Sequence, residues 1–173
     1  MDRPLPNTYW VIPGRLLAGE HPVGAEQTAG RERLTLIRDA GIDCFVDLTE
    51  DGELPDYRHL LPEHTWYLRS AIADTRVPNN VAQMQELLSR IRAALTLGRR
   101  VYVHCRAGIG RTGLVVGCLL AEEERDGKAA IKRLNRLWRQ SARADTWPKV
   151  PQTPEQADYI RHWPQLGTGN SAA

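Results

Sequence analysis

The strongest constraint on the fold of this chain lies in residues 101–121. Residues 101–103 are β-branched or aromatic, which is typical of a buried strand. The apolar run 114–121 is too long for a strand and predicts a buried helix. A glycine-bearing loop, residues 104–113, joins the two. The sequence therefore predicts a strand, a tight loop and a helix in direct succession.

The loop carries the chemistry that follows from this arrangement. Cys105 and Arg111 stand in the Cys-x5-Arg spacing. Five residues that close a turn aim backbone N–H groups inward as an anion nest, and the next helix adds its positive end. The fork of Arg111 suits two phosphate oxygens, while the nest favours the thiolate of Cys105, which attacks phosphorus in line. The residues expected to line the phosphate site are Arg106, Ala107, Gly108, Ile109 and Gly110.

Residues 104–113, His-Cys-Arg-Ala-Gly-Ile-Gly-Arg-Thr-Gly, resemble the signature loop of the protein tyrosine phosphatase superfamily. The length of the chain is closer to the small dual-specificity branch. The resemblance implies that Thr112 donates its hydroxyl to Cys105 and makes sulfur a better leaving group. His104 is interpreted as a structural donor that fixes the loop, because neighbours on a strand point to opposite faces. The alternative for the whole segment is a free core cysteine beside an ordinary glycine-rich turn.

The reaction also needs an acid, because the departing alkoxide or phenoxide must be protonated. Asp74 is the candidate, since it follows a predicted strand 31 residues before Cys105 and precedes Pro78. This Ile-x-Asp-x-x-x-Pro pattern resembles the acid loop of atypical dual-specificity phosphatases and cyclin-kinase-associated phosphatases. We expect Asp74 to act later as the base toward water. A solvated loop aspartate is the alternative.

Residues 152–159 resemble the Gln-Thr-x-x-Gln segment of classical tyrosine phosphatases, in which glutamines help to place the attacking water. By that analogy Gln152 or Gln156 positions water here. A capped helix with exposed glutamines is the alternative. Arg106 and Arg76 either widen the positive field around the loop or are surface charges.

Strands alternate with helices along the chain, which predicts an α/β fold. We expect a single domain with a central mixed, mostly parallel sheet of about five strands, and helices on both faces, like that of dual-specificity phosphatases. The expected strands are 9–12, 16–19, 44–48, 66–68 and 101–103, and the expected helices are 25–40, 80–97, 114–121, 128–141 and one that starts at 153. The predicted organisation is a loose lead-in at 1–8, a phosphatase catalytic domain at 9–165 and a disordered tail at 166–173.

Composition excludes several function classes. The net charge of +2 is too small to argue for nucleic-acid or membrane binding. No run of residues is long and apolar enough for a membrane span, and the start of the chain lacks a signal-peptide core. Three cysteines, an odd number, suggest neither a disulfide framework nor a zinc site. Cys44 and Cys118 lie in apolar runs and are interpreted as inert core residues rather than resolving thiols.

The sequence therefore predicts a cysteine-dependent phosphatase that hydrolyses phosphate monoesters through a cysteinyl-phosphate. Its expected substrates are phosphotyrosine and/or phosphoserine/threonine in proteins, and phosphoinositides or small phosphate esters are the runner-up. We expect no metal and no cofactor, because Arg111 and the nest supply the charge. A thiolate nucleophile needs a reducing compartment, which predicts a cytoplasmic protein. The rivals of other classes are a rhodanese or arsenate reductase-like thiolate enzyme and a non-catalytic phospho-binding module.

Overall fold

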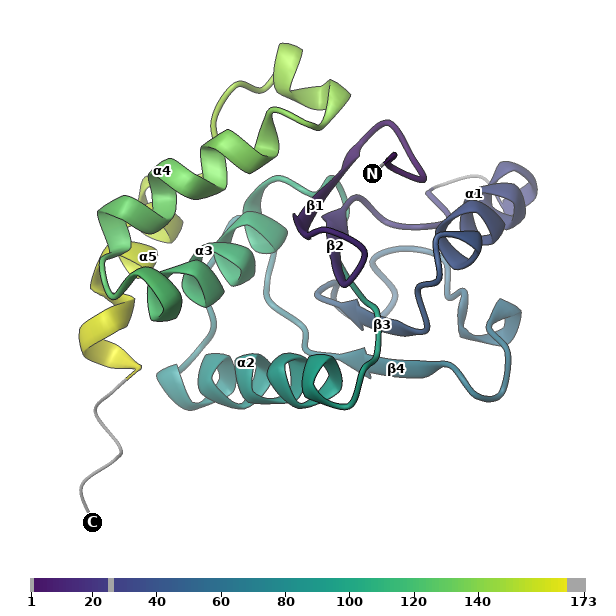
Figure 1. The fold of residues 1–173 in the computed structure, drawn as a ribbon, viewed down its shortest axis with the longest axis horizontal. Helices are drawn as coiled ribbons and strands as arrows, with labels where there is room; N and C mark the ends of the chain where they lie inside the picture. Colours follow the sequence, from purple (N-terminus) through teal and green to yellow (C-terminus); the bar gives the residue numbers. More distant parts are fainter. Residues whose placement is uncertain (1, 25–26, 168–173) are drawn as a thin grey trace.

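Five strands form the centre of the fold in the computed structural model, which describes residues 2–24 and 27–167 (Figure 1). Their order across the sheet is β1-β2-β5-β3-β4. The β1–β2 pair is antiparallel, and the pairs that join β2, β5, β3 and β4 are parallel. The strands are β1 (Thr8–Ile12), β2 (Leu16–Gly19), β3 (Cys44–Asp47), β4 (Trp66–Arg69) and β5 (Val101–His104). The sheet is mixed and mostly parallel, as the sequence predicts, and β5 is its middle strand.

Helices cover both faces of this sheet. Alternate residues of β5 point to opposite sides, so Tyr102 joins a cluster with Phe45 and with residues of α1 (Gln27–Asp39). Val101 and Val103 join the larger cluster on the other face. The helices on that face are α2 (Val81–Thr96), α3 (Gly110–Glu124), α4 (Gly127–Trp138) and α5 (Pro154–Leu166). The single α/β domain with helices on both faces is thus confirmed.

Polar side chains begin three of the helices. Asn80 accepts a hydrogen bond from the backbone at the start of α2, and Asp126 does so at the start of α4. Thr153 caps α5 in a reciprocal pair with Gln156, with Pro154 in the first turn, so α5 starts where the sequence predicts a helix. Two short 3₁₀ turns, Arg58–Leu60 and Ala142–Asp145, lie between the main elements.

The N-terminal segment is packed more closely than the expected loose lead-in. Leu5 is buried in the cluster with Phe45, because the backbone N–H of Ala142 donates to the carbonyl of Pro6 and holds the segment down. Thr8 already belongs to β1. At the other end, α5 extends to Leu166, so the predicted tail starts too early. Residues 168–173 lie outside the described part of the chain.

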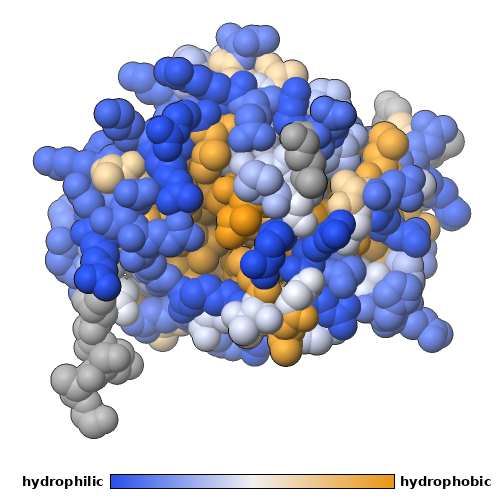
Figure 2. Space-filling view, viewed as in Figure 1, coloured by the Kyte–Doolittle hydropathy of each residue, from blue (hydrophilic) through white to orange (hydrophobic). Residues whose placement is uncertain are grey.

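One face of the molecule is hydrophobic in its centre and hydrophilic around it (Figure 2). A groove of about 230 Å³ between α2, α3 and the β1–β2 hairpin is lined there by apolar side chains that include Val11, Leu95 and Leu119. An ion pair between Arg92 and Glu122 joins α2 to α3 beside it. Among the described residues, no helix has the length and apolar character needed to cross a membrane.

Candidate active site

The loop with the Cys-x5-Arg spacing leaves the carboxyl end of the middle strand. β5 ends at His104 and α3 begins at Gly110, so the intervening loop is short. Gly108 has φ +75, and a Cβ there would lie 2.6 Å from the carbonyl carbon of Gly19. Only glycine fits such a close approach in this conformation. The end of β2 therefore forms one side of the loop, with Cys105 buried at the loop's start.

Arg111 lies in the first turn of α3, and its side chain is almost fully buried. Its Nη1 and Nη2 each donate to one oxygen of Glu53 at 2.7 Å, and Nη1 also donates to the carbonyl of Ile72 at 3.1 Å. Asp74 Oδ1 lies 3.2 Å from Nη2. Arg111 Nε has no hydrogen-bond partner among the described residues. One edge of the guanidinium is thus held by the protein, while the edge that carries Nε keeps a free donor for an oxyanion.

Charges around Arg111 keep it protonated. Burial opposes its charge, but the hydrogen bonds to Glu53 and the proximity of Cys105 and Asp74 outweigh burial and raise the pKa of Arg111 above its ordinary range. Reciprocally, the hydrogen bonds from Arg111 lower the pKa of Glu53 from 4.5 to about 2. The pair is therefore ionised on both sides at neutral pH.

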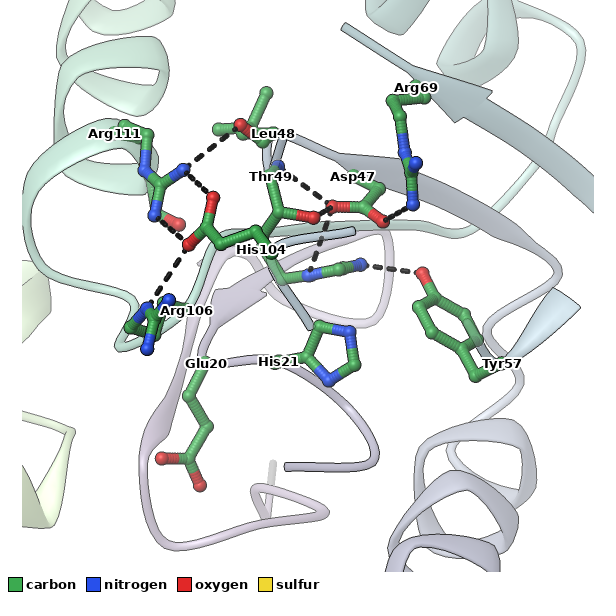
Figure 3. Close-up of polar contacts among 12 residues, drawn as sticks. Glu20, His21, Asp47, Leu48, Thr49, Tyr57, Arg69, His104, Arg106 and Arg111 are labelled. Carbon is green, nitrogen blue, oxygen red and sulfur yellow. Dashed lines mark hydrogen bonds and ion pairs between the residues drawn. The ribbon is translucent and has the colours of Figure 1, made fainter. Parts of the chain in front are cut away.

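Glu53 is the site residue that the sequence analysis missed. It lies in the polar loop after β3, and besides Arg111 it accepts a hydrogen bond from Arg106 Nε at 3.1 Å. In Figure 3, Arg106 comes from the catalytic loop and Arg111 from the start of α3, and the two side chains point toward each other. Both pair with Glu53. A residue such as Glu53 can be found only when the order of the strands in the sheet is known. β3 neighbours β5, so an acid soon after β3 lies at the same edge as Arg111. Arg106 is consequently paired, although its side chain is exposed.

The structure brings Asp74 to the arginine, as its assignment as the acid requires. The loop after β4 returns to the site because the backbone N–H of Ile72 donates to the carbonyl of Leu48 at 3.1 Å. Thr75 then adopts φ 65, a left-handed conformation that is rare for a β-branched residue. The Asp74 side chain is about half exposed, at 54%. A carboxyl group beside Arg111 and open to solvent is placed to exchange a proton with a bound ester.

The start of α5 holds the acid loop from the other side. Gln156 is buried, its Nε2 donates to the carbonyl of Arg76 at 3.0 Å, and its Oε1 accepts from the backbone of Thr153 at 3.2 Å. The hydroxyl of Thr153 donates to the carbonyl of Thr75 at 3.4 Å. The capped-helix alternative expects both glutamines to be exposed, and this is wrong for Gln156. Its amide is buried because it bonds both the backbone of Thr153 and the carbonyl of Arg76.

Gln152 differs from Gln156 in both exposure and contacts. Its side chain is exposed and lies against the catalytic loop, since a Cβ added to Gly110 would meet Gln152 Oε1 at 2.9 Å. Within the described residues, its amide makes no hydrogen bond. Of the two predicted water-positioning residues, Gln152 is therefore the one whose amide remains available.

His104 and Thr112 lie behind the loop. His104 is fully buried and shares a 2.6 Å hydrogen bond with the hydroxyl of Tyr57 (Figure 3). Burial lowers the pKa of His104 below its ordinary value, so the ring is neutral, with Asp47 4.0 Å away. The hydroxyl of Thr112 donates to the carbonyl of Gly19 at 3.3 Å. Its expected donation to Cys105 therefore stays a prediction, whereas the geometry around His104 agrees with a structural role.

The remaining candidates lie away from the loop. Arg76 is exposed and lies 3.9 Å from Glu155, which is consistent with a surface charge. Burial raises the pKa of Cys44 to about 11. Cys44 pairs in register with Val101, so it lies about 13 Å from Cys105 at ~3.3 Å per strand residue, beyond the ~7 Å that a disulfide spans. Burial also raises the pKa of Cys118 well above its ordinary value.

Within residues 2–24 and 27–167, no three His, Cys, Asp or Glu side chains are grouped so that they would hold a metal ion.

Comparisons with known proteins give one family and related folds. The family model described as "Tc-R-P: Polymorphic toxin system, DSP-PTPase phosphatase" matches residues 20–124, which include Asp74, Cys105 and Arg111. The chain is 28% identical over 136 residues to "Putative tyrosine phosphatase 197R" of Invertebrate iridescent virus 6. That match covers 76% of this chain but 47% of the viral protein, so the chain spans about half the length of this curated relative.

Solved structures of phosphatases share the fold. The active form of Tk-PTP aligns with a TM-score of 0.73 and 25% identity, covering 92% of this chain and 97% of that one. Kinase associated phosphatase (KAP) aligns with a TM-score of 0.70 and 20% identity, covering 89% and 88% of the two chains. The second likeness is one of fold alone.

Proposed function

This chain belongs to the Tc-R-P family of DSP-PTPase phosphatases, and from that premise we propose that it hydrolyses phosphate monoesters on proteins with Cys105 as the nucleophile. The substrate residues in this proposal are phosphotyrosine and/or phosphoserine/threonine. The reaction proceeds in two steps through a cysteinyl-phosphate. A cytoplasmic location belongs to the same proposal, because the thiolate must stay reduced.

In the first step the phosphate binds over residues 106–111, where backbone N–H groups and the Nε edge of Arg111 donate hydrogen bonds to its oxygens. The sulfur of Cys105 forms a bond to phosphorus while the bond from phosphorus to the leaving oxygen breaks. Asp74 gives its proton to that oxygen. Glu53 holds the opposite edge of Arg111 throughout, so the arginine needs no rearrangement to meet the developing charge.

In the second step water attacks phosphorus and the bond to Cys105 breaks. Asp74, now ionised, takes the proton from water, and inorganic phosphate leaves. The amide of Gln152 is available to orient that water beside the loop. Thr112 lies directly after Arg111 and is assigned to the departing sulfur, with its hydroxyl leaving the carbonyl of Gly19 to do so.

One observation supports this proposal above the others. Asp74 lies in the loop after β4 and Arg111 in the first turn of α3, yet their charged groups lie 3.2 Å apart, and Cys105 is near enough to Arg111 to raise its pKa. A non-catalytic phospho-binding module has no use for a carboxylate there, because the carboxylate would repel the phosphate. A rhodanese or arsenate reductase-like enzyme is disfavoured by the family to which the chain belongs. Phosphoinositides and small esters are the other substrate classes that the same loop accommodates.

Two substrates with different leaving groups test the proposal. p-Nitrophenolate leaves readily without a proton, whereas the phenolate of a phosphotyrosine peptide leaves poorly. Asp74→Asn should therefore lower kcat/KM for the peptide by about 100-fold or more, and for p-nitrophenyl phosphate by clearly less. Cys105→Ser should abolish both activities. Asp51→Asn, in the neighbouring polar loop, is the matched control and should change neither.

Equal losses on both substrates would contradict the role of Asp74 as the acid. Turnover retained in Cys105→Ser would contradict the nucleophile.

A further inference from the structure

A large groove lies beside the catalytic loop, outside the phosphate site itself. It has a volume of about 1140 Å³ and runs between α4, residues 147–153 and the start of α5. Three separate segments line it, so it is concave. Its lining combines basic side chains with Trp147, a residue that is 40% exposed, and with Pro148 and Pro151.

The basic side chains form one stripe along α4. Lys128, Lys132, Arg136 and Arg139 follow each other at spacings of four, four and three residues, which places them on one side of the helix. All four are exposed and line the groove. Lys149, also exposed, lines it from the opposite segment. The proposed reaction uses none of these five residues.

These five cations differ from the other basic residues nearby. Arg133 is paired with Glu123 and Glu124, and Arg161 is paired with Asp158. No ion pair involves Lys128, Lys132, Arg136, Arg139 or Lys149 in the part of the chain that the structure describes. Like charges four residues apart on a helix repel one another. The whole chain has a net charge of only +2, so this unneutralised charge is a local feature.

The groove is connected to the proposed active site through two of its lining residues. Gln152 lies against Gly110 of the catalytic loop, and Thr153 donates to the carbonyl of Thr75 on the acid loop. A peptide whose phosphorylated residue lies over Cys105 therefore has a direct route along Gln152 into the groove. The stripe runs from Lys128 on α4 to Arg139 at its end and extends about 16 Å, which is the length of about five extended residues.

We propose that this groove binds an acidic segment of the protein substrate, next to the phosphorylated residue in the chain. The inference rests on the proposed function and adds a substrate class to it. Carboxylates of the segment lie along the stripe on α4, and its apolar side chains contact Trp147. The concave shape favours a peptide over a flat membrane surface. Glu124 also lines the groove, but it is paired with Arg133, so the charge of the stripe stays positive.

The test compares two phosphotyrosine peptides that differ only in flanking residues, glutamates in one and glutamines in the other. Wild-type protein should show a kcat/KM about tenfold higher for the acidic peptide, mostly through KM, and the preference should shrink as salt is added. The double variant Lys132→Glu/Arg136→Glu should lose or invert the preference. Both forms should hydrolyse p-nitrophenyl phosphate equally, because neither residue touches the phosphate site.

The matched control is Arg31→Glu/Arg38→Glu on α1, which makes the same change of net charge on the other face of the sheet. It should keep the preference. Binding of both peptides to Cys105→Ser protein, followed by fluorescence anisotropy, repeats the comparison without turnover. Absence of p-nitrophenyl phosphate hydrolysis would contradict the proposed function. The binding assay would still show whether the groove prefers the acidic peptide.

Equal kcat/KM of the wild-type protein for the two peptides, together with equal affinity of Cys105→Ser protein for them, would overturn the inference. An undiminished preference for the acidic peptide in Lys132→Glu/Arg136→Glu would also overturn it. Binding of a single-stranded RNA or of vesicles rich in phosphatidylserine that depends on Lys132 and Arg136, without discrimination between the peptides, would assign the groove to another partner and overturn it as well.

Discussion

Glu53 determines how Arg111 is presented to a ligand. A guanidinium has two edges that each form paired hydrogen bonds, and Glu53 occupies the edge formed by Nη1 and Nη2. Nε itself has no hydrogen-bond partner among the described residues, although Asp74 lies 3.2 Å from Nη2. Because the arginine is buried, loss of Glu53 would leave its charge uncompensated as well as unoriented. We therefore assign Glu53 as a positioning residue that acts through Arg111.

A substitution series tests this assignment. Glu53→Ala should lower kcat/KM for phosphotyrosine peptides by about 10- to 100-fold, since a hydrogen bond to a charged group contributes roughly 1.5–3 kcal/mol. Glu53→Gln keeps one acceptor oxygen and should retain more activity. Inhibition by vanadate should weaken more in Glu53→Ala than in Glu53→Gln, because vanadate, like the phosphate, is expected to bind the edge of Arg111 that carries Nε. An unchanged inhibition constant in Glu53→Ala, with the protein folded by circular dichroism, would refute the assignment.

At the scale of elements, α5 and the acid loop act as one unit. Gln156 completes the cap of α5 and donates to the carbonyl of Arg76, so a single buried amide joins them. The strained backbone at Thr75 is held between this contact and the turn that starts at Ala73. The position of Asp74 consequently depends on a helix that starts about eighty residues later in the chain.

Replacing the two glutamines separately should give different kinetic signatures. Gln156→Ala should loosen the acid loop and lower kcat/KM for phosphotyrosine peptides about tenfold, with a smaller effect on p-nitrophenyl phosphate. Gln152→Ala should instead slow the hydrolysis of the cysteinyl-phosphate, which appears as a burst of p-nitrophenol before the steady state. A burst in Gln156→Ala and none in Gln152→Ala would reverse these two roles.

Local signals in the sequence were sufficient for the catalytic loop and for most elements. The spacing of Cys105 and Arg111 identifies the loop, and Thr153 with Pro154 identifies the start of α5. Glu53 was not predictable in this way, because its role depends on β3 lying next to β5. Burial of Gln156 likewise depends on a contact with a distant loop. The packing of Leu5 depends on residues near Ala142, far along the chain.

At the scale of the whole molecule, sheet order gathers the chemistry at one edge. The loops after β3, β4 and β5 supply Glu53, Asp74 and Cys105 in turn, and the parallel arrangement of these strands places all three loops at the carboxyl ends. Helices α4 and α5 then extend the surface beyond this edge with the basic groove. The fold thus separates phosphate chemistry at the sheet from recognition of the substrate's flanking residues at the helices.

The central claim is that phosphate passes through a covalent bond to Cys105. Rapid acid quenching during turnover of p-nitrophenyl phosphate, followed by mass spectrometry of peptides, tests it directly. The account predicts one added phosphoryl group on the peptide that contains Cys105, more of it in Gln152→Ala, and none in Cys105→Ser. Steady turnover with no phosphoryl group on that peptide in either the wild-type protein or Gln152→Ala would contradict the account.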